Sequence, residues 1–268
     1  MARRGVHEAR GQLDLLSYRL GARTAAGLTL PSFLCIGAQK AGTTWLHANL
    51  ACHPQLFVPP QKEIHYFDWF EMTSLRAYAS VFSGAGARLA GDISPGYSAM
   101  GRRRVRAVHR VLPDARVLVL LRDPVERAWS QVLMASRRVG RDPATLSARE
   151  ALSYVRSRGA RRRGEYTRML TTWKQTFGPD SVWVGFYDDI SMRPAELLSG
   201  VFRHLEVDVP TSWADFPLQD RFNAGSGAAP SPELRATLAV HFAAELDQLE
   251  QWFPTQVARW REPVELAD

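Results

Sequence analysis

A short loop rich in small residues carries the first pattern in the chain that could do chemistry. The segment Gly37–Trp45 reads GAQKAGTTW and follows the apolar run Ser32–Gly37. Small residues let backbone N–H groups curl around an anion, and the start of a following helix adds unpaired donors and a favourable dipole. The pattern indicates a phosphate-binding loop, although an ordinary turn between a strand and a helix would have a similar sequence.

The position of the lysine in this loop argues against a nucleoside triphosphatase. Gly37 and Gly42 have the spacing of the glycines in G-x-x-x-x-G-K-[ST], but Thr43 stands where the lysine belongs, and Lys40 lies inside the loop. In such enzymes the lysine reaches the β- and γ-phosphates and the next hydroxyl holds Mg²⁺. A later apolar strand also ends in Arg122, where these enzymes often need an aspartate. A nucleotide-dependent small-molecule kinase or NTPase is therefore the alternative interpretation.

A second cluster, Lys62–Asp68, reads KEIHYFD and combines ionisable with apolar side chains. Glu63 is a candidate general base because partial burial among apolar neighbours raises the pKa of a carboxyl group. The simpler alternative is a surface ion pair between Glu63 and Lys62. His65 and Asp68 are further candidates, although a lone histidine is more often structural. Their spacing matches no familiar metal motif, and we expect no metal.

The apolar runs predict the elements that position these groups. We expect strands at Ser32–Gly37, Ala90–Ile93, Arg116–Leu121 and Val182–Tyr187, and helices at Thr43–Ala51, Val125–Arg138, Tyr166–Phe177, Pro194–Leu205 and Pro232–Phe253. Strands that alternate with helices predict an α/β fold with a mostly parallel central sheet. We expect a helical extension over residues 1–30, one domain over residues 31–268, and a mobile loop at 215–232.

Composition and charge narrow the class of protein. The chain has 268 residues, of which 46% are hydrophobic, and 34 basic against 27 acidic residues give a net charge of +7. The composition is that of a globular protein, and its charge suits an anionic partner such as nucleic acid, a membrane surface, a nucleotide or an acidic glycan. Cys35 and Cys52 form no disulfide framework, and no apolar run is long enough to span a bilayer. We therefore expect a cytoplasmic protein.

Four ordered blocks carry a family resemblance. They are Gly37–Trp45, Lys62–Asp68, Gly91–Tyr97 (GDISPGY) and Arg122–Ser130 (RDPVERAWS). Together they resemble sulfotransferases that use 3′-phosphoadenosine 5′-phosphosulfate (PAPS), nearest the branch with the heparan sulfate sulfotransferases and their bacterial relatives. The resemblance is clear over residues 32–187 and looser beyond. It implies a P-loop-like three-layer fold and transfer of a sulfonate from PAPS to a hydroxyl, with an amine as second choice, of a glycan, lipid or natural product. The product nucleotide would be 3′-phosphoadenosine 5′-phosphate.

The resemblance also implies donor-binding residues. Lys40 would contact the bridging and sulfonate oxygens, while Thr43 and Thr44 would donate to the 5′-phosphate. Arg122 and Ser130 would bind the 3′-phosphate, for which bidentate arginine geometry is well suited. The other donor-binding candidates are Gln39, Ala41, Gly42, Trp45, Arg221, Ser226 and Gly227.

The acceptor side follows from the same blocks. Glu63 aligns with the glutamate base of the heparan-type enzymes, and Lys40 and His65 complete the catalytic candidates. Acceptor-binding candidates are Lys62, His65, Asp68, Ser94 and Tyr97. One departure is that Ile93 stands where these relatives often have a lysine, so Lys62 or a nearby arginine is expected to take that role.

Three interpretations stay open at this point. Trp45 could stack on adenine or pack in the core, and Arg122 could form a salt bridge at the strand end. The basic runs at residues 102–106 and 161–163 are best explained as solvated faces, with an acidic acceptor as the second interpretation. A nucleic-acid binder ranks last because these runs contain no aromatic residue. The expected partner is thus a small-molecule or glycan acceptor.

Overall fold

The computed structural model describes residues 27–68, 74–142, 145–222 and 229–262. The chain forms two compact units, which are described separately. Unit 1 comprises Met1–Leu121 with Met169–Asn223, and unit 2 comprises Arg122–Arg168 with Ala224–Asp268. The expected helical extension falls almost entirely outside the described residues, and the single domain over residues 31–268 stays a prediction.

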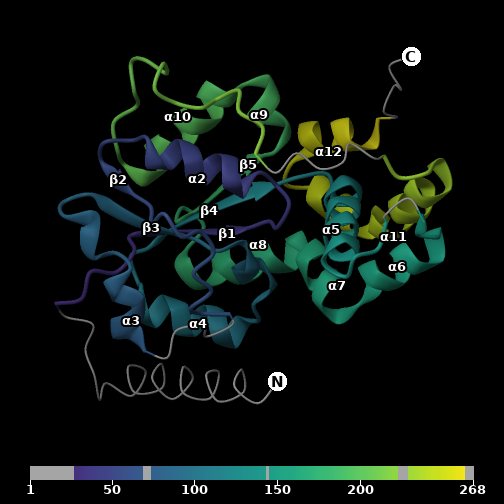
Figure 1. Ribbon diagram of the computed structural model, residues 1–268, viewed down its shortest axis with the longest axis horizontal. Helices are drawn as coiled ribbons and strands as arrows, with labels where there is room; N and C mark the ends of the chain where they lie inside the picture. The colour runs from purple at the N-terminus through teal and green to yellow at the C-terminus, as the bar shows by residue number, and fades with distance from the viewer. Residues whose placement is uncertain (1–26, 69–73, 143–144, 223–228, 263–268) are drawn as a thin grey trace. The chain divides into compact units, whose positions relative to one another are not determined.

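Unit 1 is built on a five-stranded sheet (Figure 1). Its strands are β1 (Phe33–Gly37), β2 (Leu56–Phe57), β3 (Leu89–Ile93), β4 (Arg116–Leu121) and β5 (Val182–Phe186), in the order β2-β3-β1-β4-β5. Each described pair of neighbouring strands is parallel. Strands covered on both faces read as continuous apolar runs, and all five residues of β1 are buried. The predicted parallel sheet is confirmed.

Helices cover both faces of this sheet. On one side lie α2 (Thr43–Ala51), α9 (Asp188–Met192) and α10 (Pro194–Leu205), and on the other α3 (Leu75–Ser80), α4 (Arg102–Val111) and α8 (Tyr166–Phe177) (Figure 1). Two short 3₁₀ turns, η1 (Ser83–Ala85) and η2 (Pro95–Ala99), flank β3. The predicted P-loop-like three-layer α/β fold is therefore confirmed.

The strand order places the candidate residues at one edge of the sheet. Because β1 lies between β3 and β4, the connections from β1 and β3 leave side by side, at the point where such sheets bind ligands. The Ser94 N–H donates to the Cys35 carbonyl across 3.1 Å, and the Ala38 N–H donates to the Leu120 carbonyl across 2.7 Å. The first bond ties β1 to the residue that follows β3, and the second ties the loop after β1 to β4.

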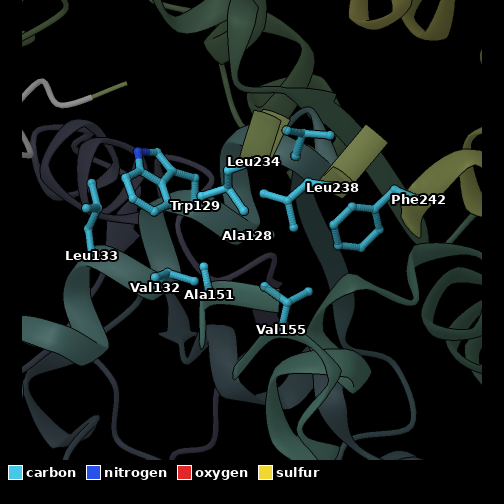
Figure 2. Packing of buried hydrophobic residues seen from close by; sticks show 10 residues of the cluster. Ala128, Trp129, Val132, Leu133, Ala151, Val155, Leu234, Leu238 and Phe242 are labelled. Atoms are coloured by element: carbon cyan, nitrogen blue, oxygen red, sulfur yellow. The ribbon is translucent and has the colours of Figure 1, made fainter. Parts of the chain in front are cut away.

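Unit 2 is a cluster of helices: α5 (Pro124–Arg138), α6 (Ala148–Arg156), α7 (Arg158–Gly164), α11 (Pro232–Glu250) and α12 (Pro254–Arg261). Side chains of α5, α6 and α11 interdigitate in its core (Figure 2). Leu234, Leu238 and Phe242 come from α11 at intervals of four residues, which places them on one face of the helix. The predicted helix over 232–253 was too long, since α11 ends at Glu250 and Pro254 begins α12.

Candidate active site

The loop between β1 and α2 has the conformation that an anion site requires. Gly42 adopts φ 83°, and a Cβ at this position would lie 2.2 Å from Ile190 Cδ1, so both backbone and space require glycine. A glycine at the N-cap has no side chain with which to cap the helix. The N-terminal N–H groups of α2 and their dipole are therefore directed at the loop rather than at a capping side chain.

Two side chains of this loop fit an anionic ligand. Lys40 adopts φ 72°, a left-handed conformation that is unusual for a lysine and brings a cation into the turn. The Gln39 Oε1 atom is buried and has no hydrogen-bond partner. An unsatisfied buried polar group costs roughly 1–3 kcal/mol. If the Gln39 carboxamide rotates by half a turn, its NH₂ group, with two donors, takes the place of the oxygen. The loop thus contains polar groups that a phosphate-bearing ligand can satisfy.

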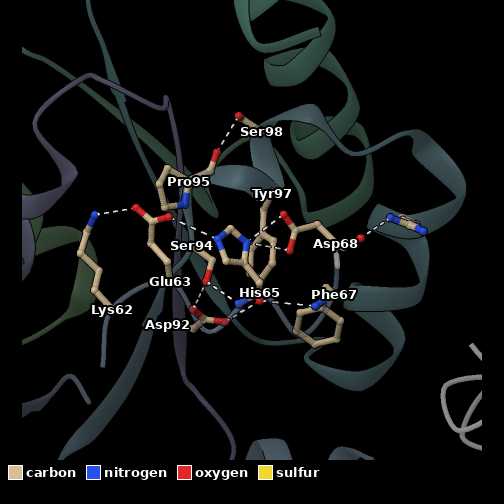
Figure 3. A network of polar contacts seen from close by, with 11 residues as sticks. Lys62, Glu63, His65, Phe67, Asp68, Asp92, Ser94, Pro95, Tyr97 and Ser98 are labelled. Atoms are coloured by element: carbon tan, nitrogen blue, oxygen red, sulfur yellow. Dashed lines mark hydrogen bonds and ion pairs between the residues drawn. The ribbon is translucent and has the colours of Figure 1, made fainter. Parts of the chain in front are cut away.

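A line of alternating charges runs through the segment after Lys62 (Figure 3). Lys62 Nζ lies 3.0 Å from Glu63 Oε1, and the other oxygen of Glu63 lies 3.2 Å from His65 Nε2. On its far side, His65 Nδ1 lies 3.0 Å from each carboxylate oxygen of Asp68. The two ring nitrogens of His65 therefore point at different carboxylates, so the group forms a chain of ion pairs.

The expectation of a raised pKa for Glu63 is wrong. The hydrogen bond from His65 is the largest influence, and with the positive charge of Lys62 it outweighs the effect of burial and lowers the pKa of Glu63 to about 2. The carboxylate is therefore ionised at neutral pH. Its side chain is 37% exposed, so an incoming molecule can reach it.

The pKa of His65 shifts in the opposite direction, upward from its ordinary value. Burial alone would lower its pKa, but the hydrogen bonds to Asp68 and Glu63 outweigh burial and raise the pKa of His65 to about 9. At neutral pH the ring is an imidazolium that donates from both nitrogens. His65 consequently holds Glu63 in place and cannot itself accept a proton in this state.

This electrostatic arrangement predicts a specific titration. We expect the His65 ring signals in an NMR titration to have a midpoint near pH 9, whereas His47, whose pKa burial lowers, titrates below 6.5 in the same sample. The stability that His65 contributes is complete below pH 6.5 and is lost as the pH rises through about 9. The stability from Glu63 is complete above pH 4.5 and is lost as the pH falls through about 2. A His65 midpoint at or below 6.5 would contradict the network.

A fully buried carboxylate, Asp92, supports the Lys62–Asp68 segment through Ser94. It accepts hydrogen bonds from Ser94 Oγ at 2.6 Å, from the Tyr97 hydroxyl at 2.7 Å and from the Tyr78 hydroxyl at 2.8 Å. Ser94 Oγ in turn accepts from the His65 backbone N–H at 3.2 Å. Asp92 is not among the site residues predicted from the sequence. A sequence signal for this role was present, since Asp92 is an acidic residue inside a predicted buried strand. A buried carboxylate must be hydrogen-bonded, so polar partners could have been expected around it.

The backbone of the segment is held in an uncommon conformation. Glu63 has φ 63° and His65 has φ 55°, and with Lys40 they are three of the four described non-glycine residues with positive φ. The Glu63 N–H donates to the Ile93 carbonyl at 3.1 Å, which fixes the segment to the end of β3. Such outliers persist only where the surrounding structure holds them, and they cluster at functional sites.

The turn η2 joins the two halves of the site. A Cβ on Gly37 would lie 3.0 Å from Ser98 Cβ, and a Cβ on Gly96 would lie 2.2 Å from Asp68 Oδ2. The loop between β1 and α2 and the His65–Asp68 pair therefore pack against the same short turn, η2. This contact brings the loop and the acidic segment to one place in unit 1.

Gly96→Ala should disconnect His65 from Asp68. The added methyl group takes the place of a carboxylate oxygen, so Asp68 must move, and we expect the His65 midpoint to fall by about one pH unit or more. NMR titration of His65 measures this shift. Gly101→Ala is the matched control because its Cβ would meet nothing within 4 Å, and its midpoint should stay near that of the wild type. An unchanged midpoint in Gly96→Ala would contradict the proposed contact.

Several predicted site residues are deeply buried. Trp45 is 3% exposed, and its indole N–H donates to the Leu218 carbonyl at 3.0 Å, which agrees with the core interpretation. Ser94 and Tyr97 are fully buried and use their hydroxyls on Asp92. Their predicted contacts with adenine and with an acceptor stay predictions.

The predicted 3′-phosphate residues Arg122 and Ser130 lie in unit 2. Arg122 Nη2 is 3.5 Å from Glu126 Oε2, so the salt bridge at the strand end is present. Ser130 is half-buried on α5, two turns after the helix begins. Arg221 is exposed, whereas the candidates Ser226 and Gly227 lie outside the described residues. The donor-binding roles of all these residues stay predictions.

Membrane-spanning helices and metal-binding clusters are both absent from the described residues. No helix in those parts of the chain is both long and apolar enough to cross a membrane. Within the same residues, no group of three or more His, Cys, Asp or Glu side chains is arranged to hold a metal ion.

Comparison with known families decides which protein class this geometry belongs to. The family model described as "Sulfotransferase family" matches residues 69–211, more than half of the chain. The chain belongs to the sulfotransferase family. The match begins just after Asp68, so the phosphate-type loop and Glu63 precede it. The kinase or NTPase alternative is not favoured.

Curated relatives of this family member are much longer than the chain. It is 38% identical over 108 residues to the membrane-associated sulfotransferase kil1 of Dictyostelium discoideum, covering 39% of this chain and 23% of the relative. It is 26% identical over 220 residues to the bifunctional heparan sulfate N-deacetylase/N-sulfotransferase 1 of Caenorhabditis briggsae, covering 74% of this chain and 25% of the relative. The chain thus spans about a quarter of the length of these relatives.

Solved structures of sulfotransferases share the fold. A sulfotransferase from Alicyclobacillus acidocaldarius aligns with a TM-score of 0.71 and 26% identity, over 87% of this chain and 99% of that one. The sulfotransferase STF9 from Mycobacterium avium aligns with a TM-score of 0.56 and 15% identity, over 88% of this chain and 81% of that one, which shows a common fold. The predicted kinship with heparan sulfate sulfotransferases and bacterial sulfotransferases is confirmed.

Proposed function

We propose that this sulfotransferase moves a sulfonate group from PAPS to an acceptor hydroxyl, with Glu63 as the general base. The observation that carries the proposal is the ionised Glu63 carboxylate, partly exposed and held between Lys62 and the His65 imidazolium. A general base must be unprotonated and accessible to the acceptor. The low pKa of Glu63 and the 37% exposure of its side chain support this role at neutral pH.

The loop residues supply the donor side of the proposal. Lys40, the N-terminal N–H groups of α2 and the hydroxyls of Thr43 and Thr44 would hold the 5′-phosphosulfate, and the unsatisfied Gln39 amide would complete the loop. When bound, PAPS supplies a sulfonate on a phosphoanhydride oxygen. Lys40 and the loop amides would stabilise the negative charge that grows on the departing phosphate. No metal is needed for this role.

The ion pairs that link Lys62, Glu63, His65 and Asp68 determine how a proton would move on the acceptor side. Glu63 would take the acceptor proton as the new S–O bond forms and the S–O bond to the phosphate breaks. His65 and Lys62 would orient the carboxylate by donating to its two oxygens. Asp68 would keep His65 protonated, because removing this partner removes the largest influence that raises the His65 pKa.

The remaining assignments belong to the proposal in the same way. Arg122 and Ser130 would contact the 3′-phosphate of the donor. Lys62 would take over the role of the lysine that Ile93 replaces, which its ion pair with Glu63 supports. We propose a glycan, lipid or natural-product acceptor, and a hydroxyl group before an amine. A cytoplasmic location stays a prediction.

A transfer assay with labelled donor tests this function directly. Purified protein is incubated with ³⁵S-labelled PAPS and a panel of hydroxyl and amine acceptors, and labelled product is separated and counted. A parallel incubation with γ-labelled ATP and Mg²⁺ tests the kinase alternative. Transfer from PAPS without transfer from ATP supports the proposal. Failure of PAPS to bind or to donate to any acceptor would refute it.

A further inference from the structure

A strongly basic hollow lies on unit 1, and its lining includes no residue of the ion-pair network around Glu63. Its volume is about 330 Å³, and its lining residues are Arg102, Arg106, His109, Arg110, Gln175 and Thr176. They come from α4 and from the last turn of α8. The hollow shares no lining residue with the candidate active site, so it requires an explanation of its own.

Three arginines form a stripe along α4. Arg102, Arg106 and Arg110 are spaced by four residues, which places their side chains on one face of the helix. Four residues rise about 6 Å, so the stripe is about 12 Å long. Like charges at this spacing destabilise a helix. An anion bound along the stripe would remove that repulsion.

The residues that the structure describes do not neutralise this stripe. In the described part of the chain these arginines form no ion pair, and the lining of the hollow includes no acidic residue. Arg102 donates to Gln175 Oε1 at 2.7 Å, a neutral acceptor that leaves its charge uncompensated. All three arginines are exposed to solvent. Their guanidinium groups are therefore available to an anion from outside.

The form of the hollow favours an acidic sugar chain. The stripe spans about 12 Å along the helix axis. A linear chain with several anionic groups can pair with all three arginines along this length, whereas a single sulfate or phosphate covers only part of it. Gln175 can donate its amide N–H groups to sugar hydroxyl groups. The Thr176 hydroxyl, which donates to the Thr172 carbonyl at 2.8 Å, can still accept a hydrogen bond from one. Single-stranded nucleic acid binds by stacking on aromatic rings, but the His109 ring packs edge-on against Phe177 at 4.9 Å. The lining includes no Phe, Tyr or Trp.

The same helix is connected to the active-site segment. Arg104 Nη1, on another face of α4, donates to the Asp68 carbonyl at 2.6 Å. In addition, α4 begins three residues after the turn η2 ends. We propose that the Arg102–Arg106–Arg110 stripe binds a segment of an acidic glycan acceptor, a chain that bears sulfate or carboxylate groups, outside the reacting centre. The description of the glycan as an acceptor rests on the proposed function. The binding of the glycan to the arginine stripe does not.

Equilibrium binding of a fluorescent dextran sulfate oligosaccharide tests the proposal on the full chain. Variant R102Q/R106Q/R110Q removes the stripe. Its matched control, R137Q/R138Q/R149Q, removes three exposed arginines of unit 2 and gives the same change in net charge. We expect the stripe variant to bind about tenfold more weakly and with a shallower salt dependence, because three ion pairs are lost. The control should change much less. Circular dichroism and thermal melting check that both variants fold.

Competitors and a second variant separate the possible outcomes. Neutral dextran should not compete, and single-stranded DNA should compete poorly because the lining of the hollow includes no Phe, Tyr or Trp. Equal weakening in the stripe variant and the control would overturn the proposal in favour of net charge alone, and so would absence of binding by the wild type. Competition by DNA as strong as that by dextran sulfate would point to nucleic acid instead. Lys40→Ala should bind dextran sulfate like the wild type. If the stripe binds but no sulfonate is transferred from PAPS, the proposed function fails and this inference stands.

Discussion

Replacement of Lys40 by alanine should lower the kcat of sulfonate transfer by about a hundred- to a thousand-fold, the range seen when one donor to a developing oxyanion is removed. The physical reason is the position of this cation inside the loop. Lys40 is held there in a left-handed conformation, at the end of β1 and before the N-terminus of α2. The departing phosphate gains negative charge during transfer, so the loss should fall mainly on kcat rather than on the KM for the donor.

Lys174→Ala provides the control for loss of a lysine. It lies on α8, and the variant should transfer sulfonate at close to the wild-type rate. The assay is the same ³⁵S transfer, run at saturating and at low PAPS so that kcat and KM are separated. A Lys40→Ala enzyme with an unchanged kcat and a raised KM would mean that Lys40 only binds the donor. An enzyme unchanged in both constants would remove Lys40 from the site.

Glu63→Gln should lower kcat by about a hundred- to ten-thousand-fold, the range for loss of a general base. The substitution keeps the shape of the side chain and an oxygen that can accept from His65. It removes the charge, and with it the ability to take a proton. The same change also weakens the attraction that raises the pKa of His65 from its ordinary 6.5 to about 9, so the His65 midpoint should move downward. Measurement of both quantities separates a lost base from a damaged fold.

The pH profile distinguishes Glu63 from His65 as the base. With Glu63 as base, kcat/KM of the wild type should have no acid limb from this residue between pH 5 and 8, because its pKa is about 2. With His65 as base, kcat/KM would rise through about pH 9, where the imidazolium loses its proton. Glu196→Gln, on α10 and with a side chain 72% exposed, controls for removal of a carboxylate and should retain full activity. A rising profile, or an active Glu63→Gln enzyme, would move the role of base away from Glu63.

Apolar runs predicted the sheet well because buried parallel strands have to be continuously apolar. The strand Arg116–Leu121 was located to the residue, and the helices over 166–177 and 194–205 were exact. The two-residue β2 and the six-residue α3 were not predicted, because segments of this length show no periodicity. The stretch from Ala148 to Gly164, with its many arginines, folds into α6 and α7 through contacts that its polar sequence does not display.

Residue types located the candidate site, but its electrostatics depended on geometry. The segment around Glu63 was found from its acid, histidine and lysine. The direction of the Glu63 pKa shift was not predicted because it depends on His65 Nε2 lying 3.2 Å from the carboxylate. That contact requires the left-handed backbone at Glu63 and His65. Asp92 was missed for a similar reason. Its three hydroxyl donors come from positions 78, 94 and 97, and only the folded chain brings these together.

The left-handed backbone at Lys40, Glu63 and His65 also limits how this protein can be made more stable. Each such residue costs about 1–3 kcal/mol relative to a relaxed conformation, so glycine at these positions would relieve strain in the native state. Each of these glycines would also delete a side chain that the proposed reaction needs. Stability gained at these three places would be paid in activity, and a thermostable version should be sought among the helices of unit 2 instead.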